Sequence, residues 1–200
     1  MAVIGAILGD IAGSQFEFFR PDNLDYKHCE LFTNYCSFTD DTVMTLAVKK
    51  AILEGVDFVK TMRAIGQPYP HAGYGEKFYD WIYGGNPKPY NSFGNGSAMR
   101  VSFVGEYFDT LEDVISWAEK SAEVTHNHPE GIKGAVVTAV CIWMAKHGKS
   151  KEEILQYVLE QYPAEKYEYS IAVPLNELER IYRWNATCMG SVATAMRCLH

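Results

Sequence analysis

The chain has 200 residues, of which 48% are hydrophobic and 22% are charged. That length and apolar content suit one compact domain with a sizeable core, and they argue against wholesale disorder. The 25 acidic and 18 basic side chains give a formal net charge of −7. Because an acidic protein has no general attraction to nucleic acid or to an anionic membrane, we expect neither as a partner.

The five cysteines are scattered along the chain, and no two of them form a Cys-x-x-C pair. We expect reduced thiols packed as small apolar residues, which indicates a cytoplasmic protein. The apolar run at residues 2–13 is interrupted by Asp10, is too short to span a bilayer and is not preceded by basic residues. We interpret this run as a core helix.

Helical patterns follow one another along the chain. Residues 2–13 carry glycines at intervals of four, and this spacing predicts a smooth helix face for close packing. Residues 42–54 form an apolar stripe that predicts a second helix, with Gly55 as its C-cap. Capping residues and periodicity predict further helices over 110–122, 129–146, 150–162 and 187–199.

Strand patterns are scarce, because no long alternating run occurs and no Asn-Gly turn is flanked by β-branched residues. Asn95-Gly96 marks a turn, but Ala98 and Met99 after it favour a helix. The sequence therefore predicts an all-α protein, an orthogonal multi-helix bundle formed by residues 1–200 as a single domain. We expect long loops, where binding residues are often found, near 20–38, 63–97 and 162–176.

The segment Phe38-Thr39-Asp40-Asp41-Thr42 places two carboxylates and two hydroxyls directly before the second helix. Such residues can act as an ordinary helix N-cap, where acceptors and negative charge are favourable. The same oxygen atoms are the ligands that Mg²⁺ and Ca²⁺ prefer, so a hard-cation site is the alternative interpretation. Because the helix dipole opposes a cation there, a metal site would need a further ligand from elsewhere.

A glycine-bearing segment, Tyr90-Asn91-Ser92-Phe93-Gly94-Asn95-Gly96-Ser97-Ala98-Met99-Arg100, lies in the middle of the chain. Glycines let backbone N–H groups face outward in a nest that binds phosphate, although a plain loop has the same composition. The rings of Tyr90 and Phe93 can either stack on a base or pack inward, and the sequence leaves both open.

Two histidines stand in the segment Thr125-His126-Asn127-His128-Pro129-Glu130-Gly131, at the entrance of a predicted helix. They indicate either a polar pocket or two structural hydrogen-bonding residues, and their spacing is not that of the H-E-x-x-H zinc motif. Asp10 and Glu17 would lie near one face if the first helix persisted. We expect the chain to leave the helix after Gly13, which would place Glu17 at a rim.

Taken together, these segments resemble the ADP-ribosylglycohydrolase family, and the resemblance covers nearly the whole chain. It implies an all-helical fold of that type and the hydrolysis of the N- or O-glycosidic bond between ADP-ribose and a protein side chain or small acceptor. The implied partner is ADP-ribose or an ADP-ribosylated protein. The resemblance rests, in family order, on Gly5–Ser14 with Glu17-Phe18, Phe38–Thr42, Phe93–Arg100, Thr125–Gly131 and Thr187-Cys188.

By the same resemblance, two Mg²⁺ ions hold the ribose and a water molecule that attacks the anomeric carbon. The implied metal ligands are Thr39, Asp40 and Asp41, and the implied catalytic carboxylates, which handle the proton, are Glu17 and Asp40. The implied substrate-binding residues, which include the loop that cradles the phosphates, are Phe93, Gly94, Asn95, Gly96, Ser97, Met99 and His126.

The sequence departs from the family pattern at its C-terminal end. Family members close with a glycine-rich D-[TS]-D-[TS] segment whose aspartates bind the metals, whereas no D-x-D occurs here and residues 180–200 contain no carboxylate. Met189 also stands where the family usually has Gln. Because each Mg²⁺ takes about six oxygen ligands, we expect one or two ions, the second only if further ligands are supplied.

We therefore expect a C-terminally shortened member of the family whose active site is completed by a second chain or by a homodimer. Such a partner would also cover the apolar faces that a shortened core leaves open. The alternatives are a non-catalytic subunit that binds ADP-ribose or a related nucleotide, and a plain helical structural domain. The sequence names neither the acceptor that is demodified nor the oligomeric state.

Overall fold

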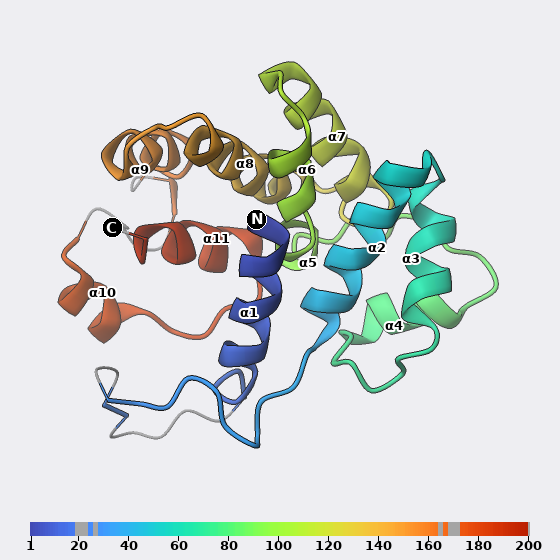
Figure 1. Cartoon of the computed structure of the whole chain (residues 1–200), viewed down its shortest axis with the longest axis horizontal. Helices are drawn as coiled ribbons and strands as arrows, with labels where there is room; N and C mark the ends of the chain where they lie inside the picture. The colour runs from blue at the N-terminus through green and yellow to red at the C-terminus, as the bar shows by residue number, and fades with distance from the viewer. Residues whose placement is uncertain (19–23, 26–27, 164–165, 168–172, 200) are drawn as a thin grey trace. The chain divides into compact units, whose positions relative to one another are not determined.

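In the computed structural model, the described residues are 1–18, 24–25, 28–163, 166–167 and 173–199. Their regular elements are helices (Figure 1), and their one bridge between extended segments joins Gly94 to Thr187. The prediction of an all-α protein is confirmed. The helices are α1 Ala2–Ser14, α2 Asp40–Glu54, α3 Phe58–Gly66, α4 Glu76–Tyr83, α5 Gly96–Met99, α6 Ser102–Tyr107, α7 Leu111–Glu123, α8 Pro129–Lys146, α9 Lys151–Gln161, α10 Leu175–Ile181 and α11 Cys188–Arg197.

The helix ends follow the capping signals of the sequence. Thr39, Thr110 and Ser150 each accept a hydrogen bond from a backbone N–H in the first turn of α2, α7 and α9. Gly55 ends α2 with a φ of 62°, and Gly148, with a φ of 75°, follows the end of α8. Because only glycine adopts such angles without steric cost, these helix ends are decided locally.

The predicted loop over 63–97 is wrong, because α3 extends to Gly66 and the whole of α4 lies inside it. Phe78, Trp81 and Ile82 form the buried side of α4 at helical spacing. The N-cap of α4 is a glycine without a side-chain bond, so its start carries no capping signal. The loops predicted near 20–38 and 162–176 lie partly outside the described residues.

The interpretation of residues 2–13 as a core helix with a close-packed glycine face is also wrong. Val3 is the buried residue of α1, whereas Ile4 and Leu8 are 61% and 49% exposed. In the described part of the chain, no atom lies within 4 Å of a Cβ placed on Gly5, Gly9 or Gly13. The spacing of the glycines predicts a smooth face, but it does not supply a neighbour that fills it.

The chain divides into two compact units, Met1–Pro87 and Lys88–His200, and each is described here by itself. In the first unit α2 contacts both α1 and α3, and α3 contacts α4. The expectation of a single domain stays a prediction. No helix formed by the described residues is both long enough and apolar enough to cross a membrane.

In the second unit, α8 contacts α5, α6, α7, α9 and α11 (Figure 1). A buried apolar cluster joins Val137 and Cys141 of α8 to residues of α9 and to Cys188 and Val192 of α11. At Gly134 of α8 the two helices meet so closely that a Cβ would lie 2.3 Å from the Cys188 sulfur atom. This close packing fixes the start of α11 against α8.

Candidate functional site

Asp10, near the end of α1, organises the entrance of α2. Its carboxylate accepts hydrogen bonds from the backbone N–H and hydroxyl of Thr39, at 2.8 and 2.6 Å. It also accepts from the N–H and hydroxyl of Thr42, at 3.1 and 2.5 Å. Since the Thr39 hydroxyl in turn accepts the N–H of Asp41 at 3.3 Å, Asp10 and Thr39 cap α2.

Asp10, Glu17, Asp40 and Asp41 form what we call the acidic cluster. Burial, followed by the charge of Asp41, raises the pKa of Asp40 to about 7. Burial, followed by the charge of Asp10, raises the pKa of Asp41 to about 6. The same two causes raise the pKa of Glu17, which lies just beyond the end of α1. The cluster thus concentrates negative charge.

No Lys, Arg or His of the described residues forms an ion pair with the acidic cluster. Its donor atoms are oxygens, which fit a hard divalent cation such as Mg²⁺. Within the same residues, however, no three His, Cys, Asp or Glu side chains are grouped closely enough to hold a metal ion. The two observations are compatible, because charge repulsion acts over longer distances than metal coordination.

The turn before α4 supports Asp40 from the side. The backbone N–H of Asp40 donates to the carbonyl of Ala72 at 2.7 Å. Gly73 has a φ of 99°, and a Cβ there would lie 3.5 Å from the Asp40 carboxylate. Phe38 and Tyr69 make an edge-to-face pair with ring centroids 5.7 Å apart, and both rings remain partly exposed. Two aromatic rings therefore lie next to the Thr-Asp-Asp segment.

The second group of predicted residues centres on residues 93–97 in the second unit, which we call the glycine loop. The N–H of Gly94 donates to Ser92 Oγ at 3.1 Å, and that of Asn95 donates to the Ala186 carbonyl at 2.7 Å. Both N–H groups therefore donate to acceptors within the protein. Neither is free to form part of a phosphate-binding nest. Ser97 is fully buried and its hydroxyl donates to the Gly131 carbonyl, whereas Phe93 is 44% exposed.

His126 lies against the glycine loop and is only 4% exposed. Its Nδ1 is 2.7 Å from the Thr125 hydroxyl, which accepts an N–H of the buried Arg100 guanidinium at 2.9 Å. The Thr125 hydroxyl thus links the His126 ring to the Arg100 guanidinium, which can only donate. A Cβ on Gly96 would lie 3.1 Å from Nε2, so that edge of the ring contacts the loop backbone.

His126 is held neutral. Burial, followed by the positive charge of Arg100, lowers the pKa of His126 to about 3. A neutral ring has one donor and one acceptor nitrogen and carries no charge. Tyr90 lies on another side, with its ring centroid 6.0 Å from that of His126. The sequence did not decide whether the rings of Tyr90 and Phe93 pack inward. In the structure Tyr90 is half-buried and Phe93 is exposed.

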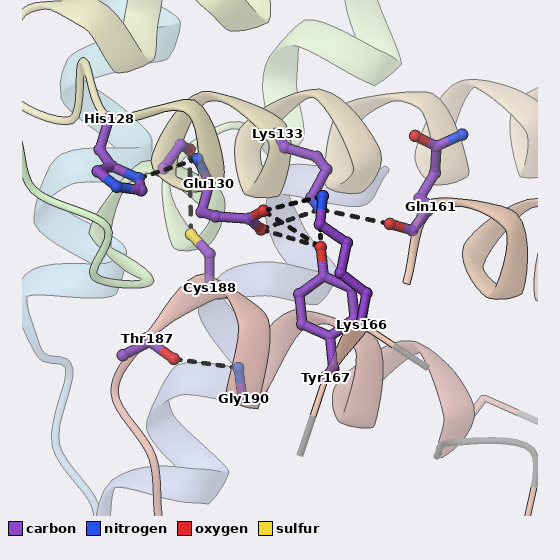
Figure 2. Close-up of polar contacts among 10 residues, drawn as sticks. His128, Glu130, Lys133, Gln161, Lys166, Tyr167, Thr187, Cys188 and Gly190 are labelled. Carbon is purple, nitrogen blue, oxygen red and sulfur yellow. Dashed lines mark hydrogen bonds and ion pairs between the residues drawn. The ribbon is translucent and has the colours of Figure 1, made fainter. Parts of the chain in front are cut away.

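His128 and Glu130 belong to the start of α8 and have structural partners (Figure 2). His128 is the N-cap, and its Nδ1 accepts the N–H of Glu130 at 3.1 Å. The Glu130 carboxylate pairs with Lys133 at 2.9 Å and accepts from the Tyr167 hydroxyl at 3.2 Å. Tyr167 and Lys133 also contact each other directly. Both histidines therefore lie beside the glycine loop: His126 against its backbone at Gly96, and His128 with its ring centroid 5.3 Å from that of Phe93.

The structure brings the predicted residues together in two groups, one in each unit. Thr39, Asp40 and Asp41 share the acidic cluster with Glu17, and the glycine loop shares His126. Met99, at the end of α5, is half-buried. Sequence reasoning assigned no role to Asp10 or Arg100, although both lie within the quoted motifs. Their signal was weak because each acts through a partner more than twenty residues away.

These helices and the two groups define an all-α protein of the ADP-ribosylglycohydrolase fold. A solved structure titled "ADP-ribosylglycohydrolase-related protein complex" aligns with a TM-score of 0.69 over 99% of this chain and 73% of that chain, at 22% identity. The family model described as ADP-ribosylglycohydrolase matches residues 1–198. The chain therefore belongs to the ADP-ribosylglycohydrolase family.

Several curated relatives carry the same family name or a related one. ADP-ribosylhydrolase ARH3 of Homo sapiens is 30% identical over 186 residues, which cover 74% of this chain and 50% of that protein. The putative ADP-ribosyl glycohydrolase L543 of Acanthamoeba polyphaga mimivirus is 25% identical and covers 83% of this chain and 61% of its own length. The chain thus spans about half the length of the ARH3 proteins that it matches.

Proposed function

We propose that this chain serves in the Mg²⁺-dependent hydrolysis of the glycosidic bond between ADP-ribose and a protein side chain or small acceptor. The observation that carries the proposal is the acidic cluster, in which burial and mutual repulsion raise the pKa of Asp40 and of Asp41. A divalent cation relieves such repulsion and favours the ionised carboxylates. Membership of the family supports the class of reaction.

In this proposal Thr39, Asp40 and Asp41 hold the cation through oxygen atoms. When bound, Mg²⁺ would act as a Lewis acid toward the ribose hydroxyls and a water molecule. Glu17 and Asp40 are the carboxylates that would accept or return the proton of that water. Asp10 keeps the motif in place through its four hydrogen bonds.

The glycine loop and His126 serve to bind the diphosphate of ADP-ribose. In this proposal the neutral His126 ring supports the loop backbone, because it lies against Gly96 so closely that a Cβ there would be 3.1 Å from Nε2. The exposed ring of Phe93 is available to stack on the adenine, and Met99 adds an adaptable apolar surface. Each of these contributions comes from the second unit alone.

We also propose that a second chain, or a second copy of this chain, completes the coordination of the cation. The support is that the described residues contain no group of three His, Cys, Asp or Glu side chains that could hold a metal ion. Mg²⁺ prefers six oxygen ligands, and water fills only some of them at a catalytic centre. Light scattering with and without Mg²⁺ and ADP-ribose tests this, and a monomer that is fully active alone would contradict it.

Calorimetry of ADP-ribose binding with and without Mg²⁺, followed by a release assay on an ADP-ribosylated protein, tests the main proposal. We expect binding that depends on Mg²⁺, and its loss in Asp40→Ala and Asp41→Ala. Asp80→Ala is the matched control, because Asp80 is an exposed acid of α4 in the same unit. Binding and turnover that survive both changes at the motif would show that the site is wrong.

The same experiment separates the enzyme from the second candidate, a non-catalytic subunit that binds ADP-ribose. The lack of a complete metal-binding group among the described residues favours this candidate. A binder would show Mg²⁺-dependent thermal stabilisation by ADP-ribose, because a ligand selective for the native state raises apparent stability. It would release no ADP-ribose from the modified protein, even with excess Mg²⁺.

A further inference from the structure

The segment that leads into α11 is paired with the glycine loop along its backbone. The N–H of Asn95 donates to the Ala186 carbonyl at 2.7 Å, and the N–H of Cys188 donates to the Phe93 carbonyl at 2.9 Å. Between these bonds, Gly94 and Thr187 form the isolated antiparallel bridge. The glycine loop is thus held by a segment more than ninety residues further along the chain.

The Cys188 side chain adds a contact that the backbone pairing does not provide. Its sulfur atom lies 3.0 Å from the Gly94 carbonyl oxygen, to which the S–H donates. The same sulfur lies 3.7 Å from the hydroxyl of Ser97 and 3.9 Å from the carbonyl of Gly131, at the start of α8. Figure 2 shows Cys188 at the start of α11, pointing toward the first turn of α8. One thiol therefore contacts the loop, α5 and α8.

The surroundings keep this thiol in one position and in its protonated form. Cys188 is fully buried, and the closeness of Gly134 leaves no space for a bulkier side chain. Burial raises the pKa of the Cys188 thiol to about 11, so the S–H remains a donor at neutral pH. A sulfur fixed in this way can hold the carbonyl that it contacts.

The start of α11 is itself anchored, so it can act as a support for the loop. Thr187 caps the helix by accepting the N–H of Gly190 at 3.1 Å (Figure 2). Asn185 accepts both the N–H and the hydroxyl of Thr187, at 2.9 and 2.7 Å. A Cβ on Gly190 would lie 2.2 Å from the Asn185 side chain, so the turn is tightly packed.

We propose that Cys188 is a positioning residue, whose S–H fixes the Gly94 carbonyl and thereby holds the glycine loop against His126 in the geometry that binds the ligand. The identity of that ligand, ADP-ribose, rests on the proposed function. The placement of the loop does not rest on it, and it can be measured without any ligand.

Cys141 provides the matched control. It is buried on α8 in the same apolar cluster as Cys188, and the described structure shows no hydrogen bond from its thiol to the glycine loop. If both cysteines merely fill the core, their replacement should have the same consequences. If Cys188 positions the loop, only its replacement should loosen residues 90–97.

The test compares Cys188→Ala, Cys188→Ser and Cys141→Ala by hydrogen exchange of the peptide 90–97, thermal stability and ADP-ribose affinity. For Cys188→Ala we expect faster exchange in this peptide and an affinity for ADP-ribose that is about tenfold weaker, the size of one hydrogen bond. Cys188→Ser keeps a donor and should restore the affinity to within about threefold. Cys141→Ala should lower the melting temperature and leave exchange and affinity unchanged.

Equal exchange of the peptide 90–97 in Cys188→Ala and Cys141→Ala would overturn the proposal. If the alanine variant does not fold, the Raman S–H stretching band of the wild-type protein decides, assigned by its loss in Cys188→Ser. A band shifted down relative to that of Cys141 supports the bond to Gly94, and an unshifted band refutes it. If the wild-type chain binds no ADP-ribose, the proposed function fails, and hydrogen exchange still decides the role of Cys188.

Discussion

At the scale of single residues, one side chain organises the start of α2. The Thr-Asp-Asp motif is visible in the sequence, yet Asp10, which accepts four hydrogen bonds from Thr39 and Thr42, lies about thirty residues before it. Asp10 thus takes part in capping a helix that begins about thirty residues further along the chain. No local sequence pattern predicts this contact between Asp10 and the start of α2.

Replacement of Asp10 by Ala should therefore destabilise the chain more than the loss of an ordinary helix cap. Partly buried donors of Thr39 and Thr42 lose their acceptor, which costs about 2 kcal/mol after partial relief of the repulsion with Asp41. Asp57→Ala removes a simple N-cap at α3 and should cost about 1 kcal/mol. Urea denaturation of both variants measures the difference, and equal costs would contradict the role of Asp10.

His126 makes stability depend on pH in a defined direction. Its pKa is lowered to about 3 in the folded chain, so the unfolded chain binds more protons between that value and the ordinary pKa near 6.5. The stabilisation is complete above about pH 6.5 and is lost as the pH falls toward 3. His126→Gln removes this dependence. From pH 7 to 4.5, the wild type should lose roughly 2 kcal/mol more stability in urea titrations than the variant. Parallel losses would refute this prediction.

At the scale of elements, glycines inside helices differ in what they contact. Gly105 of α6 lies so close to α8 that a Cβ would be 2.3 Å from the Ala139 carbonyl oxygen and 2.8 Å from Ile142. Gly9 of α1 has no neighbour within 4 Å in the described part of the chain. The sequence shows both as glycines in helices, and only the packing separates them.

Gly105→Ala should destabilise the chain by at least about 2 kcal/mol, because the backbone of α8 cannot move away at low cost. Gly9→Ala should be neutral, or should stabilise by up to about 1 kcal/mol, since alanine favours the helix. Thermal unfolding followed by circular dichroism compares the two. A destabilised Gly9→Ala would reveal a neighbour of α1 that the described residues do not contain.

At the scale of the whole molecule, charge limits the range of partners. The net charge is −7 and the isoelectric point is about 5.4, whereas ADP-ribose is itself anionic. Long-range electrostatics therefore oppose binding of the proposed ligand, and the proposed divalent cation at the acidic cluster would reverse this locally. The same charge disfavours nucleic acid.

The chain should pass through a heparin column at about 0.15 M salt and should be retained on an anion exchanger at neutral pH. Fluorescence anisotropy with a labelled DNA duplex should show no binding under the same conditions. Tight, salt-sensitive binding to the duplex would contradict the exclusion of nucleic acid and would indicate a basic surface that the overall charge conceals.

The sequence by itself determined the all-α class, most of the long helices and the motifs of the family, because their signals are local. A cap such as Ser150 and its partner Glu153 lie within three residues of each other. Only the tertiary structure decided that α1 carries an open glycine face, that Asp10 caps α2 and that Cys188 reaches a carbonyl 94 residues away. These contacts depend on how helices pack, and packing is a property of several distant segments at once.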